Sequence, residues 1–349
     1  MTQNLINLYS DTQTKPSVEM REAIANAEVG DEQQEADPTT NRLQSMVAEL
    51  LGKEAALFLP SGVMCNQIAV KVWTNPGEEI ILHESAHIVN FESGGAAALS
   101  GTMTRNLTGD RGMFTADQVR ESLRPKGRHQ PVQSLLAVEN TANLGGGAIW
   151  PIEQIEAVCA VAHEAGLKTH LDGARLLNAV VASGTAASDY AAPFDSLWID
   201  LSKGLGCPVG GVLAGSRSFI EDAFRFKHMY GGAMRQSGMI AAAGVYALNH
   251  NIDRMKDDHE NARFLAKLLV DIPGVAVPDK NIETNMVFFD VSGTGMSAAE
   301  VSSRLLDRGV KIGATSETRL RAVTHLDVNR DHVTAAAEAL ASVCHGENR

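Results

Sequence analysis

The chain has 349 residues, and 44% of them are hydrophobic, which is enough for a large core and more than one compact unit. Its 42 acidic and 30 basic residues give a formal net charge of −12, which argues against nucleic acid or an anionic membrane surface as the partner. No apolar run approaches the roughly 18 residues of a transmembrane helix, and the N-terminal segment lacks the basic and apolar regions of a signal peptide.

Strand and helix patterns alternate through the first two thirds of the chain. Short β-like runs lie at 55–59, 79–83, 134–139, 168–172, 197–201 and 210–215. Thr115 and Gln118 form a capping-box pattern for a helix over 115–123, and Pro151 opens an amphipathic helix over 151–166. Near-continuous apolar strands that alternate with helices predict an α/β fold with a mainly parallel sheet covered on both faces.

After about residue 250 the pattern changes to that of a smaller α+β unit. Helices are expected over 251–272 and 297–309 and at the C-terminus, with strands at 286–292, 311–314 and 320–326. We therefore expect an N-terminal arm (1–15) that contributes to the site, a large domain (16–248) and a small C-terminal domain (249–349).

Cysteine spacing bears on the compartment and on metal binding. The four cysteines are Cys65, Cys159, Cys207 and Cys344. Because none of them stands in a CxxC pair, the sequence argues against a disulfide framework or a structural zinc site and favours a reducing cytoplasm.

Polar residues stand where three of the predicted strands end. Glu139 and Asn140 follow one strand, Asp172 ends another, and Lys203 follows a third. Ligands of open α/β sheets bind beyond the carboxyl ends of the strands. We therefore expect these side chains to share one crevice although they lie far apart in the sequence.

Lys203 is the residue that points to a reaction. A crevice lysine serves either to bind phosphate in a Walker loop or to form a Schiff base with a carbonyl. The Walker pattern places its glycines before the lysine, whereas here Gly204, Gly206, Gly210 and Gly211 follow it. No GxGxxG opens the first βα unit either, which weakens a dinucleotide site. The Schiff base remains, and it suits pyridoxal phosphate.

Five other residues can serve a pyridoxal phosphate site. Asp172 can keep the pyridine nitrogen protonated, although an isolated aspartate at a strand end more often caps the next helix. Ser61 and Gly62 join a strand to a helix start whose N–H groups can hold the phosphate, and Ser202 can add a hydroxyl. His87 can cover the ring, although a lone histidine is more often an ordinary surface or core residue.

These residues lie in blocks that resemble a known family almost end to end. The blocks are "LYSDTQTKP", "AHIVNFESGGAA", "LAVENT", "HLDGARLLNA", "LSKGLGCPVGG", "GGAMRQSGMIAAAGVYAL" and "VTHLDV". They resemble the low-specificity L-threonine aldolases, which belong to the fold-type-I pyridoxal phosphate enzymes with the aspartate aminotransferase architecture. The resemblance implies cleavage of L-threonine, L-allo-threonine or related L-3-hydroxy-α-amino acids to glycine and an aldehyde, by a homodimer or homotetramer with its sites at the subunit interface.

The resemblance also implies a role for each site residue. The coenzyme would be held by Lys203, Asp172, His87, the phosphate cup Ser61, Gly62 and Val63, Ser202, and Arg235 from the subunit interface. The substrate carboxylate would be held by Ser10, Arg175 and Arg321. His129 would lie near the substrate hydroxyl, and the base would be either His87 or His129, acting directly or through a water molecule. The resemblance implies no metal.

One position departs from the family pattern. The family often has a histidine after "ENT", where this chain has Ala142. We expect the loss of that imidazole to shift the preference towards bulkier or aromatic substrates such as phenylserine. Two alternatives stay open at this point: a β-eliminating lyase that releases pyruvate and ammonia, and a catalytically silent binding protein on the same scaffold.

Overall fold

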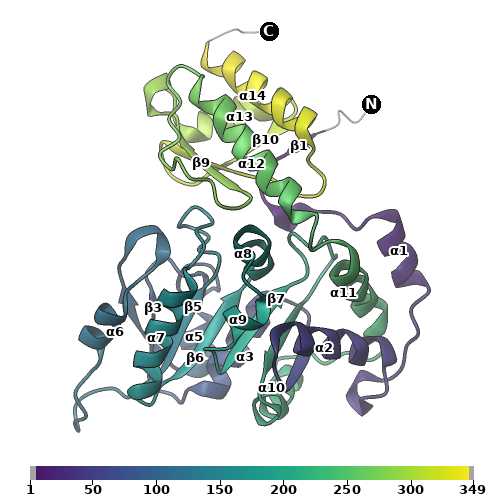
Figure 1. The fold of residues 1–349 in the computed structure, drawn as a ribbon, viewed down its shortest axis with the longest axis vertical. Coiled ribbons are helices and arrows are strands. Elements are labelled where there is room, and N and C mark those ends of the chain that lie inside the picture. The colour runs from purple at the N-terminus through teal and green to yellow at the C-terminus, as the bar shows by residue number, and fades with distance from the viewer. Residues whose placement is uncertain (1–4, 346–349) are drawn as a thin grey trace.

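The computed structural model describes residues 5–345, which form a larger and a smaller unit (Figure 1). The larger unit is built on a seven-stranded sheet, and the smaller one on a three-stranded sheet and a separate pair of short strands. Figure 1 shows the smaller unit, formed by the C-terminal third of the chain and β1 (Ile6–Asn7), seated above one end of the larger one. A cavity of about 400 Å³ is lined by residues of both units, among them Leu144 and Phe288.

The seven-stranded sheet is mainly parallel, as the sequence predicts. Its strand order is β2 (Ala55–Leu59), β8 (Gly211–Gly215), β7 (Ser196–Asp200), β6 (Lys168–Gly173), β5 (Gln133–Glu139), β3 (Glu79–His83) and β4 (Met103–Leu107). Only β8 runs antiparallel to its neighbours. The edge strand β4 is absent from the predicted runs because four of its five residues are exposed and its sequence, MTRNL, lacks an apolar run.

Helices cover both faces of this sheet. One face is covered by α3 (Gly62–Trp73), α4 (His87–Asn90), α5 (Gly95–Ser100) and α10 (Arg217–Met229). The other is covered by α2 (Pro38–Leu51), α6 (Ala116–Ser122), α7 (Ile152–Glu164), α8 (Leu176–Ser183), α9 (Ala187–Ala191) and α11 (Gly238–His250), with α1 (Val18–Ala25) packed on α11. The predicted capping box of α6 is confirmed, since Thr115 and Gln118 bond to each other's backbone.

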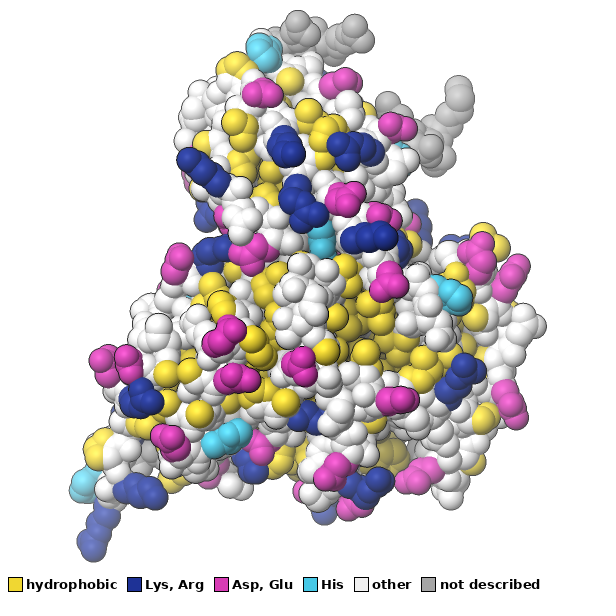
Figure 2. All heavy atoms as spheres, in the orientation of Figure 1, with side chains coloured by type: hydrophobic (Ala, Val, Ile, Leu, Met, Phe, Trp, Pro, Cys, Tyr) yellow, Lys and Arg dark blue, Asp and Glu magenta, His cyan; other side chains and the backbone are white. Residues whose placement is uncertain are grey.

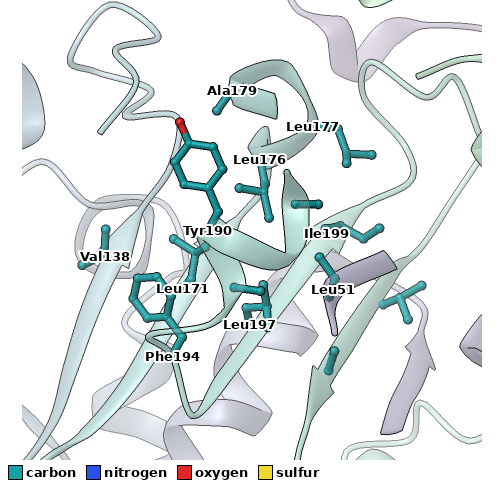
Figure 3. Close-up of a cluster of buried hydrophobic side chains, with 14 of the residues drawn as sticks. Leu51, Val138, Leu171, Leu176, Leu177, Ala179, Tyr190, Phe194, Leu197 and Ile199 are labelled. Atoms are coloured by element: carbon teal, nitrogen blue, oxygen red, sulfur yellow. The ribbon is translucent and has the colours of Figure 1, made fainter. Parts of the chain in front are cut away.

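The core lies on both sides of the central strands because successive side chains of a strand point to opposite faces. On β7, Leu197 and Ile199 pack under α8 and α9, whereas Trp198 packs under α3. Figure 3 shows Leu197 and Ile199 beside Leu171, together with the rings of Tyr190 and Phe194. Burial on both faces explains why these strands read as continuous apolar runs.

The smaller unit has its own hydrophobic cluster. Its elements are the antiparallel strands β11 (Gly313–Ala314), β12 (Arg319–Val323) and β9 (Met286–Asp290), the parallel pair β1 with β10 (Val310–Lys311), and the helices α12 (Met255–Val270), α13 (Ala298–Leu306) and α14 (Arg330–Cys344). The short 3-10 helices are η1 (Asp11–Gln13), η2 (Glu32–Gln34), η3 (Asp110–Gly112) and η4 (Ser292–Thr294). The N-terminal arm thus adds a strand to the smaller unit; residues 1–4 of the predicted arm lie outside the described residues.

Two predicted elements of the smaller unit are wrong in detail. The strand predicted at 311–314 is divided between two sheets, because Val310 and Lys311 pair with β1 whereas Gly313 and Ala314 pair with β12. The helix predicted from residue 251 begins at Met255, after a turn that follows α11. The domain boundaries at residues 15 and 248 stay a prediction.

Acidic and basic side chains are mixed over the face shown in Figure 2, and hydrophobic side chains gather on the larger unit beneath the smaller one. Within residues 5–345, no helix is long and apolar enough to cross a membrane. All four cysteines are free thiols, and three of them are buried.

Candidate active site

Lys203 lies just beyond the carboxyl end of β7, where the sequence places it. Its Nζ is 3.0 Å from Oδ2 of Asp200, and its side chain is only 14% exposed. The Oγ of Thr14 donates to the Lys203 carbonyl, so the N-terminal arm holds the turn that carries the amine. The Ser202 hydroxyl donates to Oδ1 of Asp200. Asp200 therefore contacts two residues of the turn that follows β7, Ser202 and Lys203.

Asp172 lies at the end of the adjacent strand β6, in a buried polar cluster. Its Oδ2 accepts a hydrogen bond from Nδ2 of Asn66 at 2.7 Å, and its Oδ1 accepts from the backbone of Ala174. The same Asn66 nitrogen donates to Oε1 of Glu92, which also lies 2.9 Å from Nδ1 of His87. Ligand atoms of His87, Glu92 and Asp172 lie within 4.8 Å of one another. Hydrogen bonds already account for this arrangement, and the absence of a metal stays a prediction.

His87 is ordered through both its backbone and its ring. The Nδ1 atom donates to Glu92, which leaves Nε2 as the ring nitrogen available to a ligand. Burial lowers the pKa of His87, but the hydrogen bond to Glu92 and the negative charges of Asp172, Glu92 and Glu139 outweigh it and raise this pKa above 6.5. The imidazole is therefore held beside a strongly acidic set of groups.

Glu139 ends β5 and joins two loops of the crevice. Its Oε2 accepts from the His87 backbone at 2.6 Å, and its Oε1 accepts from the Asn143 backbone at 2.8 Å. Burial and the nearby charge of Asp172 raise the pKa of Glu139 to about 7. Glu139 therefore fixes the loops on either side of it.

Arg175 forms a buried ion pair with Asp11. Its Nε and Nη2 donate to the two oxygens of Asp11 at 2.7 and 2.6 Å, and both side chains are buried. Asn285, at the start of the smaller unit's sheet, also donates to Asp11. Burial raises the pKa of Asp11, but the charge and hydrogen bonds of Arg175, with Lys203 and Asn285, hold this pKa far below its ordinary value. The arm residue Asp11 thus connects the two units through Arg175 and Asn285.

Arg321 faces the same region from β12. Its Nη1 donates to Oδ1 of Asn143, and its Nε is buried without a partner among the described residues. Burial and the positive charge of Arg175 lower the pKa of Arg321, so an anion between these two arginines would relieve an existing repulsion. Ser10 is buried nearby in the arm and accepts two hydrogen bonds from Thr12.

The start of α3 forms the third part of the site. The Ser61 hydroxyl caps the helix by accepting from the Met64 backbone, and Val63 is 40% exposed. A Cβ on Gly62 would lie 2.1 Å from the ring of Trp198. Glycine therefore lets the helix begin directly above β7, where its free N–H groups can face an anion.

We expect Gly62→Ala to destabilise the protein by about 1–3 kcal/mol, because the helix start must move away from Trp198. The same movement should weaken binding of an anionic ligand at the helix start. Thermal denaturation and titration of the ligand check both effects. Gly127→Ala is the matched control, since a Cβ there meets only ordinary contacts at 3.8 Å; equal effects in the two variants would contradict the argument.

Two predicted site residues are not brought into this crevice. His129 is exposed in the loop before β5, at the amino end of that strand, whereas the crevice lies at the carboxyl end. Seven strand residues, or about 23 Å, separate the two ends of β5. Arg235 is 62% exposed and pairs with Asp31. The roles of His129 and Arg235 stay predictions.

Sequence reasoning missed four residues of the site: Asp11, Asn66, Glu92 and Asp200. Asp11 and Glu92 lie inside blocks quoted in the sequence analysis, and Asp200 directly precedes one, whereas Asn66 lies four residues after Gly62. The function of each depends on a partner distant in the chain or on the turn that follows. The only available signal was their chemistry, since a carboxylate or amide in an otherwise apolar helix or strand must find a partner when buried.

The residues present fit pyridoxal phosphate, whose site needs an amine for the aldehyde, an acid for the ring nitrogen and N–H donors for the phosphate. Lys203, Asp172 and the start of α3 supply these groups from one edge of the sheet. The Nδ2 of Asn140 is buried at the same edge and has no partner among residues 5–345, so a donor remains for a ligand.

Comparison with known proteins agrees with this site. A family model described as beta-eliminating lyase matches residues 7–292. The low specificity L-threonine aldolase of Escherichia coli K12 is 42% identical over 334 residues, which cover 95% of this chain and 97% of that protein. The low-specificity L-threonine aldolase 1 of Arabidopsis thaliana is 38% identical over 338 residues, which cover 95% and 94% of the two chains.

The fold has close counterparts among solved structures. The structure of Leishmania major threonine aldolase superposes with a TM-score of 0.81 at 18% identity, over 97% of this chain and 99% of that one. The architecture is that of the fold-type-I pyridoxal phosphate enzymes. The chain therefore belongs to the low-specificity L-threonine aldolases within the beta-eliminating lyase family, and it is a pyridoxal phosphate-dependent carbon–carbon lyase.

Proposed function

We propose that the chain cleaves L-threonine, L-allo-threonine and related L-3-hydroxy-α-amino acids between Cα and Cβ, releasing glycine and an aldehyde. The observation that supports this proposal is that Asp172 at the end of β6 and Lys203 just beyond the adjacent parallel strand β7 lie at the same edge of the sheet. Arg175 and Asp11 lie close enough to Arg321 for their charges to affect it, and the Nε of Arg321 has no partner among the described residues. An amine, an acid and a carboxylate-binding group are what the reaction needs. Family relatives named for this activity support the same conclusion.

The coenzyme supplies a link to the substrate amine and an acceptor for the electron pair of the Cα–Cβ bond. Lys203 would hold the coenzyme before the substrate arrives and help to release glycine. Asp172 would keep the ring nitrogen protonated. Arg321 would hold the substrate carboxylate together with the Ser10 hydroxyl and Nη1 of Arg175, the nitrogen that Asp11 does not bind. These contacts would orient the Cα–Cβ bond that is broken.

His87 is the base that this chain can offer, with its Nε2 directed away from Glu92. The raised pKa of His87 means that the ring gains a proton as pH falls, so the base is lost on the acid side. We expect kcat/KM for glycine formation to fall as pH drops through this pKa, and His87→Asn to remove that limb of the profile. His163→Asn, at an exposed ion pair with Asp195, is the control. An unchanged acid limb in His87→Asn would assign the base to another group.

The loop after β5 supports a preference for larger substrates. Ala142 is buried, and a Cβ on Gly112 or Gly145 would lie 2.8 or 3.0 Å from its methyl group. The two glycine segments thus lie directly against the Ala142 methyl group. Next to this loop a cavity of about 400 Å³ is lined in part by Leu144 and Phe288. We propose that it accommodates bulky or aromatic substituents on Cβ.

An assay of products tests the proposal. L-threonine, L-allo-threonine and L-phenylserine are each supplied to the loaded enzyme, and glycine, aldehyde, pyruvate and ammonia are all quantified. We expect equimolar glycine and aldehyde, with phenylserine turned over at least as fast as threonine. Pyruvate and ammonia as the main products would instead establish a β-eliminating lyase, and a strong threonine preference would refute the role of the cavity.

We also propose that the chain forms a homodimer or homotetramer in which Arg235 and His129 serve a neighbouring site. Their exposure supports this, as does the apolar surface beneath the smaller unit (Figure 2). Sedimentation analysis would measure the assembly, and a monomer with full activity would rule it out. The four free cysteines support the reducing cytoplasm as the compartment.

A further inference from the structure

Asn66 is a fully buried residue of α3 that contacts two carboxylates and two ring N–H groups. Its Nδ2 is 2.7 Å from Oδ2 of Asp172 and 2.7 Å from Oε1 of Glu92. Its Oδ1 lies 2.7 Å from Nε1 of Trp198 and 3.1 Å from Nε2 of His170. All four hydrogen-bonding positions of the amide are thus filled by side chains that are themselves buried.

The orientation of the Asn66 amide is fixed by donor and acceptor chemistry. The indole nitrogen of Trp198 can only donate, so the atom facing it must be the carbonyl oxygen. The amide nitrogen then faces Asp172 and Glu92, which accept as carboxylates. In the reverse orientation the amide oxygen of Asn66 would face the two carboxylates, and its NH2 group would face the indole N–H of Trp198. Neither contact is a hydrogen bond, so that orientation is excluded.

A relay behind Asn66 reinforces this orientation. Because Oδ1 accepts, Nε2 of His170 must carry its proton, and Nδ1 of His170 then accepts from the Ser196 hydroxyl at 2.8 Å. The Ser196 oxygen in turn accepts from Nε1 of Trp73 at 2.8 Å. Burial lowers the pKa of His170 to about 4, so this histidine stays neutral at physiological pH and keeps the single tautomer that the relay requires.

We propose that Asn66 is a positioning residue for the coenzyme: its amide, held by Trp198 and His170, fixes Asp172 as the anionic partner of the ring nitrogen. The N–H bond to Oδ2 restrains the rotation of the Asp172 carboxylate. The second N–H restrains Glu92 and, through it, His87. One helix residue thus orders the groups on which the coenzyme's ring depends. The inference rests on the proposed contact of Asp172 with that ring, and not on which amino acid is cleaved.

The test reads the protonation of the coenzyme ring directly. The holoenzyme is loaded with pyridoxal phosphate labelled with ¹⁵N in the ring, and its ¹⁵N chemical shift is measured together with the coenzyme's dissociation constant. Asn66→Asp keeps the shape and the acceptor for Trp198 but sets a third carboxylate against Asp172 and Glu92. Crowded like charges make the carboxylates share a proton, which neutralises Asp172 in part and costs the ring nitrogen its anionic partner. We therefore expect the ring nitrogen to lose its proton in part and the coenzyme to bind about ten- to a hundredfold more weakly.

Gln67→Glu is the matched control, because it introduces the same negative charge at the next residue of α3. Among residues 5–345, Nε2 of Gln67 donates only to Glu92, at 2.5 Å. We expect this variant to leave the ring signal unchanged. An equal shift in both variants would overturn the proposal, since the effect would then be general to negative charge in the pocket. An unshifted signal in Asn66→Asp would overturn it as well.

Two more variants keep the result interpretable. Asp172→Asn is the reference: if it does not alter the ring signal, the proposed site is wrong, whereas a change there without one in Asn66→Asp refutes only the role of Asn66. Asn66→Ala removes the donor without adding charge and replaces Asn66→Asp if that variant fails to fold, as judged by its melting temperature. We expect it to shift the ring signal in the same direction by a smaller amount.

Discussion

Lys203→Ala is expected to lower cleavage of 3-hydroxy amino acids by at least about a thousandfold and to abolish the borohydride-trapped adduct between the coenzyme and the protein. Lys203 is the amine at the carboxyl edge of the sheet, 3.0 Å from Asp200 and beside the turn held by Thr14. Without it no covalent link to the coenzyme can form. Absorbance spectra, borohydride trapping followed by peptide mass analysis, and a glycine assay measure the effect.

Two further variants separate the amine from its charge. Lys203→Arg keeps a positive partner for Asp200 but supplies no nucleophilic amine, so we expect the same loss of activity with less loss of stability. Lys168→Ala removes a half-exposed lysine that pairs with Asp195 and should leave turnover unchanged. A borohydride adduct on any lysine other than 203 in the wild-type protein would refute the assignment.

Asp11→Ala is expected to lower the free energy of unfolding by about 3–5 kcal/mol, because it leaves the buried guanidinium of Arg175 without its partner. Both side chains are almost fully buried and joined by two hydrogen bonds. The loss of the link to Asn285 should also raise KM, since the arm then positions Ser10 and Arg175 less well. Urea denaturation and steady-state kinetics measure the two effects.

The same pair gives a pH dependence of stability with a definite sign. The pKa of Asp11 is depressed in the folded protein, so its contribution is fully present above the unfolded value near 3.8. That contribution is lost progressively as pH falls below this value towards the folded pKa. We expect Asp11→Ala to lack this acid-dependent part of the unfolding curve. Asp327→Ala, at an exposed contact with the Lys15 backbone, is the control and should cost under about 1 kcal/mol.

The sequence by itself determined the main elements and the chemistry of the site. Apolar runs buried on both faces predicted the strands that carry Lys203 and Asp172, and local cap chemistry predicted the start of α6 at Thr115. These signals are readable because they depend on neighbouring residues: a strand's composition, a cap's spacing, and the position of a polar group after an apolar run. The amine and the acid could therefore be placed at the same edge before any coordinates were known.

Only the tertiary structure decided which partners these groups have. Asn66 lies 106 positions from Asp172, and Asp11 lies 164 positions from Arg175, so no local spacing relates them. The direction of β5 separates His129 from the crevice, although its distance from Asn140 in the sequence suggested proximity. Strand direction, the packing of α3 on the sheet and the return of the arm to the smaller unit bring distant groups into contact. Burial then makes each unpaired polar group costly, and this selects the pairs that form.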